Sequence, residues 1–102
     1  IRTCSSDPSV AQIMAVVGSD CNGTKHPLWE ENLALALQLR EALNQKLPNV
    51  CRPVSLRNAS YNQELAPRFL LLEIGSGANS VKEAQNAARL VGETLADLIY
   101  AR

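Results

Sequence analysis

The amino-acid sequence predicts an α/β fold in which a largely parallel sheet is flanked by helices. Two short apolar runs, at residues 11–17 and 69–74, have the length and composition of buried strands. Each is followed by a stretch with the 3.6-residue period of an amphipathic helix, at residues 27–47 and 81–98. Because crossovers between parallel strands are right-handed, this order would place the helices against one sheet.

Length and composition limit the possible function. A chain of 102 residues forms at most one domain, and its ten basic residues balance ten acidic ones, which argues against a nucleic-acid or membrane-surface partner. No run is long enough to cross a bilayer. The chain begins at Ile1 without a signal segment, so we expect it to be a piece of a longer protein.

The three cysteines are widely separated in the sequence. Cys4, Cys21 and Cys51 form no Cys-x-x-Cys pair, which argues against a structural zinc site. They leave room for one internal disulfide at most, by any of three pairings.

The first half of the chain predicts a strand, a loop and a long helix. Gly18 ends the apolar run at residues 11–17, and residues 19–25 have the polar composition of a loop. The helix at residues 27–47 begins with a proline and is stopped by Pro48.

Asn32 falls within the apolar face of that helix. The other residues of this face are Leu28, Leu35, Ala36, Leu39 and Leu43. A buried amide without hydrogen-bond partners costs about 1–3 kcal/mol, so Asn32 should either pin a loop or face a functional site.

Residues 50–56 alternate in polarity and contain Pro53, which favours a strand near the sheet edge. The polar connection at residues 57–67 carries Tyr61 and Asn62, and its length predicts a functional loop or a short helical turn.

Glu73 interrupts the apolar run at residues 69–74, which reads as an inner strand buried on both faces. The carboxylate must therefore be neutralised, hydrogen-bonded or placed at an opening. One interpretation places Glu73 at the carboxyl end of an inner strand, where open α/β sheets keep active sites. The structural alternative is a strand-end glutamate paired with a nearby arginine.

The last segment predicts a capped helix. Ser80 and Glu83 have the spacing of a capping box. The apolar face of the helix would consist of Val81, Ala84, Ala88, Val91, Leu95 and Leu98. In a parallel sheet, three polar segments would meet at the carboxyl ends of the strands: residues 18–20, 58–63 and 73–79.

Glu73 also precedes a Gly-x-Gly segment, as in the first motif of Rossmann-like methyltransferases. Asn79 replaces the third glycine, and the residues after it are too few for the remaining strands of that fold. A phosphate-binding loop is disfavoured because the required lysine is missing.

A second resemblance covers the chain from about Val10 to its end. The sequence resembles the C-terminal part of the stage II sporulation protein P family, cell-wall hydrolases related to zinc-dependent N-acetylmuramoyl-L-alanine amidases. The resemblance is carried by Val16-Val17-Gly18-Ser19-Asp20, His26-Pro27-Leu28-Trp29-Glu30-Glu31-Asn32-Leu33, Leu56-Arg57, Tyr61-Asn62-Gln63-Glu64-Leu65, Leu71-Leu72-Glu73-Ile74-Gly75, Asn79 and Glu83-Ala84.

The resemblance implies that residues 1–102 are the C-terminal part of a single amidase-like catalytic domain whose N-terminal half is absent. It implies a peptidoglycan hydrolase in the cell envelope, outside the cytoplasmic membrane and anchored there by missing N-terminal sequence. Other cell-wall remodelling proteins are further expected partners. Glu73 would be the general acid/base for water that zinc activates against the muramoyl–L-alanine amide bond. Asn32, Tyr61, Asn62 and Asn79 would support the site or contact the glycan, with Asn79 tying down the turn or capping the last helix.

The resemblance places the zinc ligands upstream of Ile1. A catalytic zinc needs three protein ligands, and His26 is the chain's one histidine, so these residues alone should be inactive. Two other functions remain open at this stage: a non-catalytic module that binds peptidoglycan or a partner, and a fragment of an S-adenosylmethionine-dependent methyltransferase.

Overall fold

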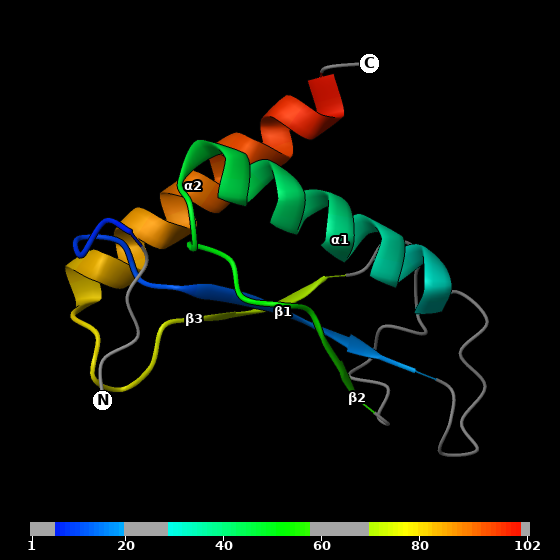
Figure 1. Ribbon diagram of the computed structural model, residues 1–102, viewed down its shortest axis with the longest axis horizontal. Helices are drawn as coiled ribbons and strands as arrows, with labels where there is room; N and C mark the ends of the chain where they lie inside the picture. Colours follow the sequence, from blue (N-terminus) through cyan, green and yellow to red (C-terminus); the bar gives the residue numbers. More distant parts are fainter. Residues whose placement is uncertain (1–5, 20–28, 58–69, 101–102) are drawn as a thin grey trace.

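The computed structural model describes residues 6–19, 29–57 and 70–100. In chain order its elements are β1 (Ile13–Gly18), α1 (Trp29–Lys46), β2 (Ser55–Arg57), β3 (Leu71–Ile74) and α2 (Val81–Tyr100) (Figure 1). The predicted order of strands and helices is confirmed. Within the described residues, neither helix combines the length and the apolar character that crossing a bilayer requires.

The sheet is mixed, so the prediction of a largely parallel sheet is wrong. Its strand order is β2-β1-β3, with β2 parallel and β3 antiparallel to the central strand β1. The reason is visible in β3 itself. Leu72 and Ile74 pack against the core whereas Glu73 is exposed, which is the alternation of an antiparallel strand with one solvated face.

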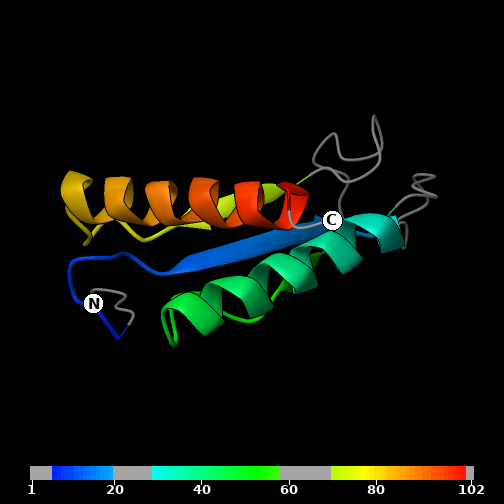
Figure 2. The ribbon, with the colours of Figure 1, turned by 90° about the horizontal axis from the view of Figure 1, so that it is seen from above.

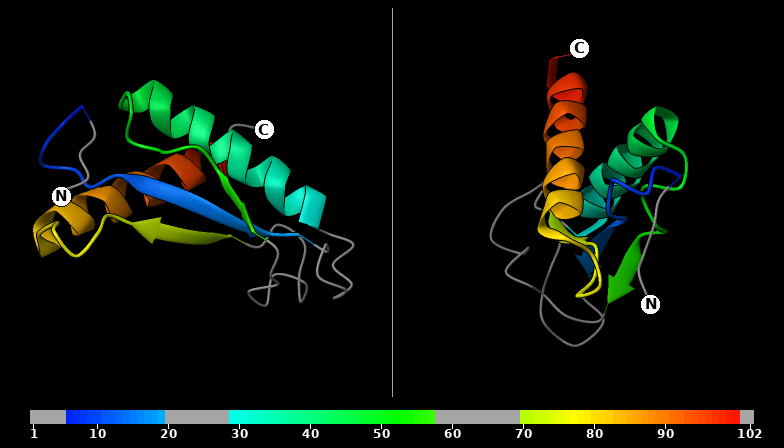
Figure 3. Two further views of the ribbon diagram at one scale, coloured as in Figure 1. Left: turned by 60° about the horizontal axis from the view of Figure 1, so that its bottom comes forward. Right: turned by 90° about the vertical axis from the view of Figure 1, so that its left-hand side faces the viewer.

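Both helices cover the same face of the sheet, as the two views in Figure 3 show. The odd-numbered residues of β1 point toward them, and Ile13, Ala15 and Val17 are almost completely buried. The core consists of these side chains and the inner faces of α1 and α2. Within the described residues, no helix lies on the other face.

The strand prediction at residues 50–56 is confirmed in part. The backbone of Cys51 pairs with that of Ile13 in an isolated β-bridge, and β2 pairs with the end of β1. Both pairings are parallel. Between them the pairing is interrupted at Pro53, which has no backbone N–H to donate. The described strand is therefore shorter than predicted, but it lies at an edge of the sheet as expected.

Helix α1 keeps the predicted buried face. Asn32, Ala36, Leu39 and Leu43 are buried along it. The helix ends before Pro48, and Asn49 follows with a φ of 63° as the third residue of a turn in which the Val50 N–H donates to the Leu47 carbonyl at 3.2 Å. Asn44 fixes the chain that comes back, because its side-chain amide donates to the Cys51 carbonyl (3.0 Å) and accepts from the Cys51 N–H (2.8 Å).

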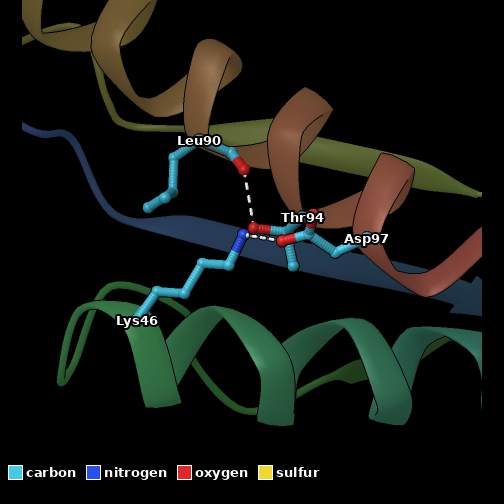
Figure 4. A network of polar contacts seen from close by, with 4 residues as sticks. All are labelled: Lys46, Leu90, Thr94 and Asp97. Carbon is cyan, nitrogen blue, oxygen red and sulfur yellow. Dashed lines mark hydrogen bonds and ion pairs between the residues drawn. The ribbon is translucent and has the colours of Figure 1, made fainter. Parts of the chain in front are cut away.

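The capping box of α2 is confirmed. Ser80 Oγ accepts from the Glu83 N–H at 3.1 Å, and Glu83 Oε1 accepts from the Ser80 N–H at 2.8 Å. The predicted apolar face is rotated, since Val81 and Ala88 are exposed and Ala87 and Thr94 are buried. Thr94 is tolerated inside because its hydroxyl donates to the Leu90 carbonyl at 2.7 Å (Figure 4).

The two helices pack against each other and cross obliquely, as Figure 1 and Figure 2 together show. At the C-terminal end of α1, Lys46 Nζ lies 2.5 Å from Asp97 Oδ2 of α2 (Figure 4). The Asp97 side chain is mostly exposed, so this ion pair contributes at most about 1 kcal/mol, and apolar packing holds the helices together.

Candidate functional site

Glu73 lies on the face of the sheet that carries no described helix. It pairs with Met14 of β1, while its neighbours Leu72 and Ile74 point into the core. Because successive side chains of a strand alternate between faces, the Glu73 carboxylate projects away from α1 and α2. Its side chain is 50% exposed. The expectation of a carboxylate on a strand buried on both faces is therefore wrong.

The expected meeting of three strand ends is also wrong. The carboxyl end of β3 lies beside the beginning of β1, because Ile74 pairs with Ile13 and the Gly75 N–H donates to the Gln12 carbonyl at 2.7 Å. Gly18 is at the opposite end of β1. Residues 73–79 and residues 18–19 are thus separated, and β3 is an edge strand of the described sheet. The third expected segment, residues 58–63, is outside the described residues.

Arg57 is the partner of Glu73. One of its guanidinium nitrogens, Nη2, lies 3.5 Å from Glu73 Oε1, and the two side chains are 41% and 50% exposed. This contact confirms the structural alternative of a glutamate paired with a nearby arginine. It leaves the carboxylate half accessible to solvent, so the ion pair and a role in proton transfer are compatible.

We predicted no role for Arg57 from the sequence, although it is one of the residues that carry the family resemblance. Ser55 and Arg57 are two residues apart in β2 and pair with Val16 and Gly18, so they share the face on which Glu73 lies. Their alternating pattern is the signal that could have suggested a polar face here.

Asn79 ties down the turn after β3, as expected. Its Oδ1 accepts from the Ser76 N–H at 2.9 Å, and its Nδ2 donates to Glu83 Oε1 at 3.4 Å. Gly75 has a φ of 70°, the left-handed region that favours glycine. The Gly-x-Gly segment therefore forms a turn around the Asn79 side chain, and Gly75 supplies the backbone conformation that this turn requires.

Of the other predicted site residues, Asn32 is described and is not brought to Glu73. Asn32 is fully buried in α1, on the helix side of the sheet. Tyr61 and Asn62 lie outside the described residues, as does His26. Their predicted roles as site or glycan contacts stay predictions.

The described residues do not fit a catalytic zinc site. No group of three His, Cys, Asp or Glu side chains comes together among them. Three protein ligands are the usual requirement for such an ion. The side chain beside Glu73 is an arginine, whose positive charge repels a metal ion.

A hollow formed by described residues lies elsewhere. A cavity of about 720 Å³ lies between α1 and α2. It is lined mainly by apolar and amide side chains, among them Leu35, Gln38, Leu95 and Leu98, together with Glu41. Glu73 is on the opposite face of the sheet and does not line it.

Comparison with known proteins assigns the family. The family model described as Stage II sporulation protein P matches residues 5–96, which is most of the chain. This chain belongs to the stage II sporulation protein P family. Stage II sporulation protein P of Bacillus subtilis (strain 168) is 31% identical over 97 residues, covering 90% of this chain. The chain spans 23% of that relative's length. No solved structure matches.

Family membership and the antiparallel β3 argue against the methyltransferase interpretation. The methyltransferase motif needs its Gly-rich loop after a strand of a parallel sheet, at the edge where the other strands also end. In this member of the stage II sporulation protein P family, the loop follows β3 beside the beginning of β1, so it lies at the other end of the strands from the carboxyl end of β1.

Proposed function

We propose that this chain is part of a sporulation-related peptidoglycan hydrolase that cleaves the N-acetylmuramoyl–L-alanine amide bond. The observation that carries the proposal is the family match over residues 5–96. The resemblance to amidases extends through the Leu71-Leu72-Glu73-Ile74-Gly75 segment, and the Glu73 carboxylate stands half exposed on the face that carries no described helix.

Glu73 is the proposed general acid/base. Its carboxylate accepts a proton from the attacking water while the water oxygen bonds to the amide carbon. It then returns that proton to the L-alanine nitrogen as the carbon–nitrogen bond breaks. A carboxylate held on a strand of the sheet is positioned more precisely for this transfer than one on a loop.

The described residues provide one side of the proposed active site. We assign the zinc of the related amidases, and its ligands, to the remainder of the full-length protein. The relative's additional length supports this assignment, because this chain covers only 23% of it. We likewise propose that the full-length protein acts in the cell envelope, outside the cytoplasmic membrane and anchored to it, on peptidoglycan and beside other cell-wall remodelling proteins.

Product analysis tests the proposal. Purified full-length protein is incubated with sacculi, and mass spectrometry identifies the released fragments. The proposal predicts free peptides that begin with L-alanine and glycan strands that keep their lactyl groups. Peptides cut only at their cross-links, or no fragments at all, would contradict amidase action.

A second candidate is a non-catalytic module that binds peptidoglycan or a partner. The Arg57–Glu73 ion pair favours it, because pairing accounts for the two opposite charges on this face without any reaction. Co-sedimentation with sacculi in the absence of any cleavage product would support this candidate over the hydrolase.

A further inference from the structure

We propose that Arg57 is a positioning residue that holds the Glu73 carboxylate in place from the far side of the central strand. The inference rests on the proposed function of Glu73. It is carried by the contact between Arg57 Nη2 and Glu73 Oε1 at 3.5 Å. These two residues belong to the two edge strands of the described sheet, β2 and β3, which pair with β1 and not with each other.

The register shows how the contact spans the sheet. Arg57 is opposite Gly18, whereas Glu73 is opposite Met14, four residues earlier along β1. The pair therefore crosses β1 diagonally over a strand length of about 13 Å. Gly18, opposite Arg57, has no side chain, and Val16 is the β1 residue whose side chain lies on this face between the two ends of the diagonal.

Ser55 fixes the other end of the guanidinium. The Arg57 Nε–H donates to Ser55 Oγ at 3.2 Å, within the same strand and on the same face. The planar guanidinium thus has its orientation set at Nε while Nη2 faces the carboxylate. A lysine at this position would keep the charge and lose the contact with Ser55.

The geometry is better suited to orientation than to stability. Pairs this exposed contribute at most about 1 kcal/mol to folding, and both long side chains lose rotamer freedom. The recorded contact uses Oε1, so among the described residues Oε2 is the oxygen available to the reacting water. A carboxylate misplaced by about 1 Å can lose about 100-fold in rate.

The test compares variants of the full-length protein on soluble peptidoglycan fragments, with kcat and KM measured separately. Arg57→Met should lower kcat by about 10- to 100-fold and leave KM nearly unchanged. Arg57→Lys should recover part of the lost kcat, because it restores the positive charge. Arg52→Met removes an exposed arginine from the segment before β2 and should match the wild type.

Glu73→Gln separates the two proposals. If Glu73→Gln keeps the wild-type rate, the proposed function of Glu73 fails, and the role of Arg57 fails with it. If Glu73→Gln is inactive while Arg57→Met keeps the wild-type kcat, only the role of Arg57 is overturned. A raised KM with an unchanged kcat would make Arg57 a substrate-binding residue and would also overturn positioning.

Ser55→Ala provides an independent variant in case Arg57→Met does not fold. It removes the acceptor for Arg57 Nε and leaves the ion pair's charges intact. The loss of one hydrogen bond that orients the guanidinium should lower kcat by about two- to tenfold. A wild-type kcat for folded Ser55→Ala, as judged by circular dichroism, would overturn the anchoring part of the proposal.

Discussion

Asn79 fills the space in which a side chain on Gly75 would begin. A Cβ atom added at Gly75 would lie 2.7 Å from Asn79 Oδ1 and 3.1 Å from the Cβ of Ala11. Gly75 is thus required for two reasons, its φ of 70° and the close approach of Asn79. The turn that follows the Glu73 strand depends on this pair of residues, and it connects that strand to the cap of α2.

Gly75→Ala should destabilise the fold by about 1–3 kcal/mol, because alanine is strained at this φ and collides with Asn79. The free energy of unfolding from urea titration measures the effect. Gly77→Ala is the matched control in the same turn, since a Cβ there meets nothing within 4 Å. Equal stabilities of the two variants would show that the Asn79 contact does not constrain the turn.

Ser80→Ala should cost about 0.5–2 kcal/mol, because the Glu83 N–H loses its acceptor at the start of α2. Ser80→Asp keeps an oxygen acceptor at the same position and should stay near the wild type. Thermal unfolding followed at 222 nm compares the two. A Ser80→Asp variant as unstable as Ser80→Ala would contradict the capping role.

Asn44→Ala should destabilise the fold by about 2–3 kcal/mol. It removes both hydrogen bonds to the backbone of Cys51 and leaves two half-buried polar groups without those partners. Gln45→Ala, at the exposed next position of α1, should change the free energy of unfolding by about 0.5 kcal/mol or less. The account fails here if the two substitutions have the same effect.

The Cys51 thiol should resist alkylation in the folded protein. Burial raises its pKa, and the nearby Arg40 guanidinium opposes this with a smaller effect. A raised pKa lowers the thiolate fraction, which is the reactive form, at any pH below it. In a Cys4→Ser, Cys21→Ser variant, iodoacetamide at pH 8 should modify Cys51 slowly in buffer and rapidly in guanidinium chloride. Rapid modification in buffer would contradict the burial.

The raised pKa of Cys51 also determines how the stability of the fold changes with pH. Because the pKa of Cys51 is higher in the folded state than in the unfolded state, its contribution is complete below the unfolded-state pKa. That contribution is lost as the pH rises through the folded-state value. The Cys51→Ala variant should therefore lose less stability than the wild type between pH 8 and pH 10. An identical alkaline loss in both proteins would exclude this thiol as a contributor.

Local patterns in the sequence predicted the elements well because each has its own physical signal. Pro48 stops α1 within two residues of its observed end, and the Ser80–Glu83 spacing identifies the start of α2. The direction of β3 was predicted wrongly because six largely apolar residues were interpreted as buried on both faces. The exposed Glu73 between Leu72 and Ile74 was the sign of alternation, and therefore of an antiparallel edge strand.

The candidate site was less predictable than the fold. Glu73 was identified from its unusual position in an apolar run, but its partner comes from a different strand that is not its neighbour. No local pattern specifies which arginine crosses a central strand to meet a carboxylate. The buried face of α2 was also predicted wrongly, because Thr94 is polar. Its hydroxyl donates to the Leu90 carbonyl within the helix, so the side chain can be buried.

The most direct test of the account measures the hydrolysis of sacculi by full-length protein carrying Glu73→Gln. Glu93→Gln is the matched control, because Glu93 is an exposed glutamate of α2. We predict that Glu73→Gln, with unchanged folding, loses at least about 100-fold in rate, the lower range for a general acid/base, while Glu93→Gln keeps the wild-type rate. Undiminished hydrolysis by Glu73→Gln would contradict the central claim.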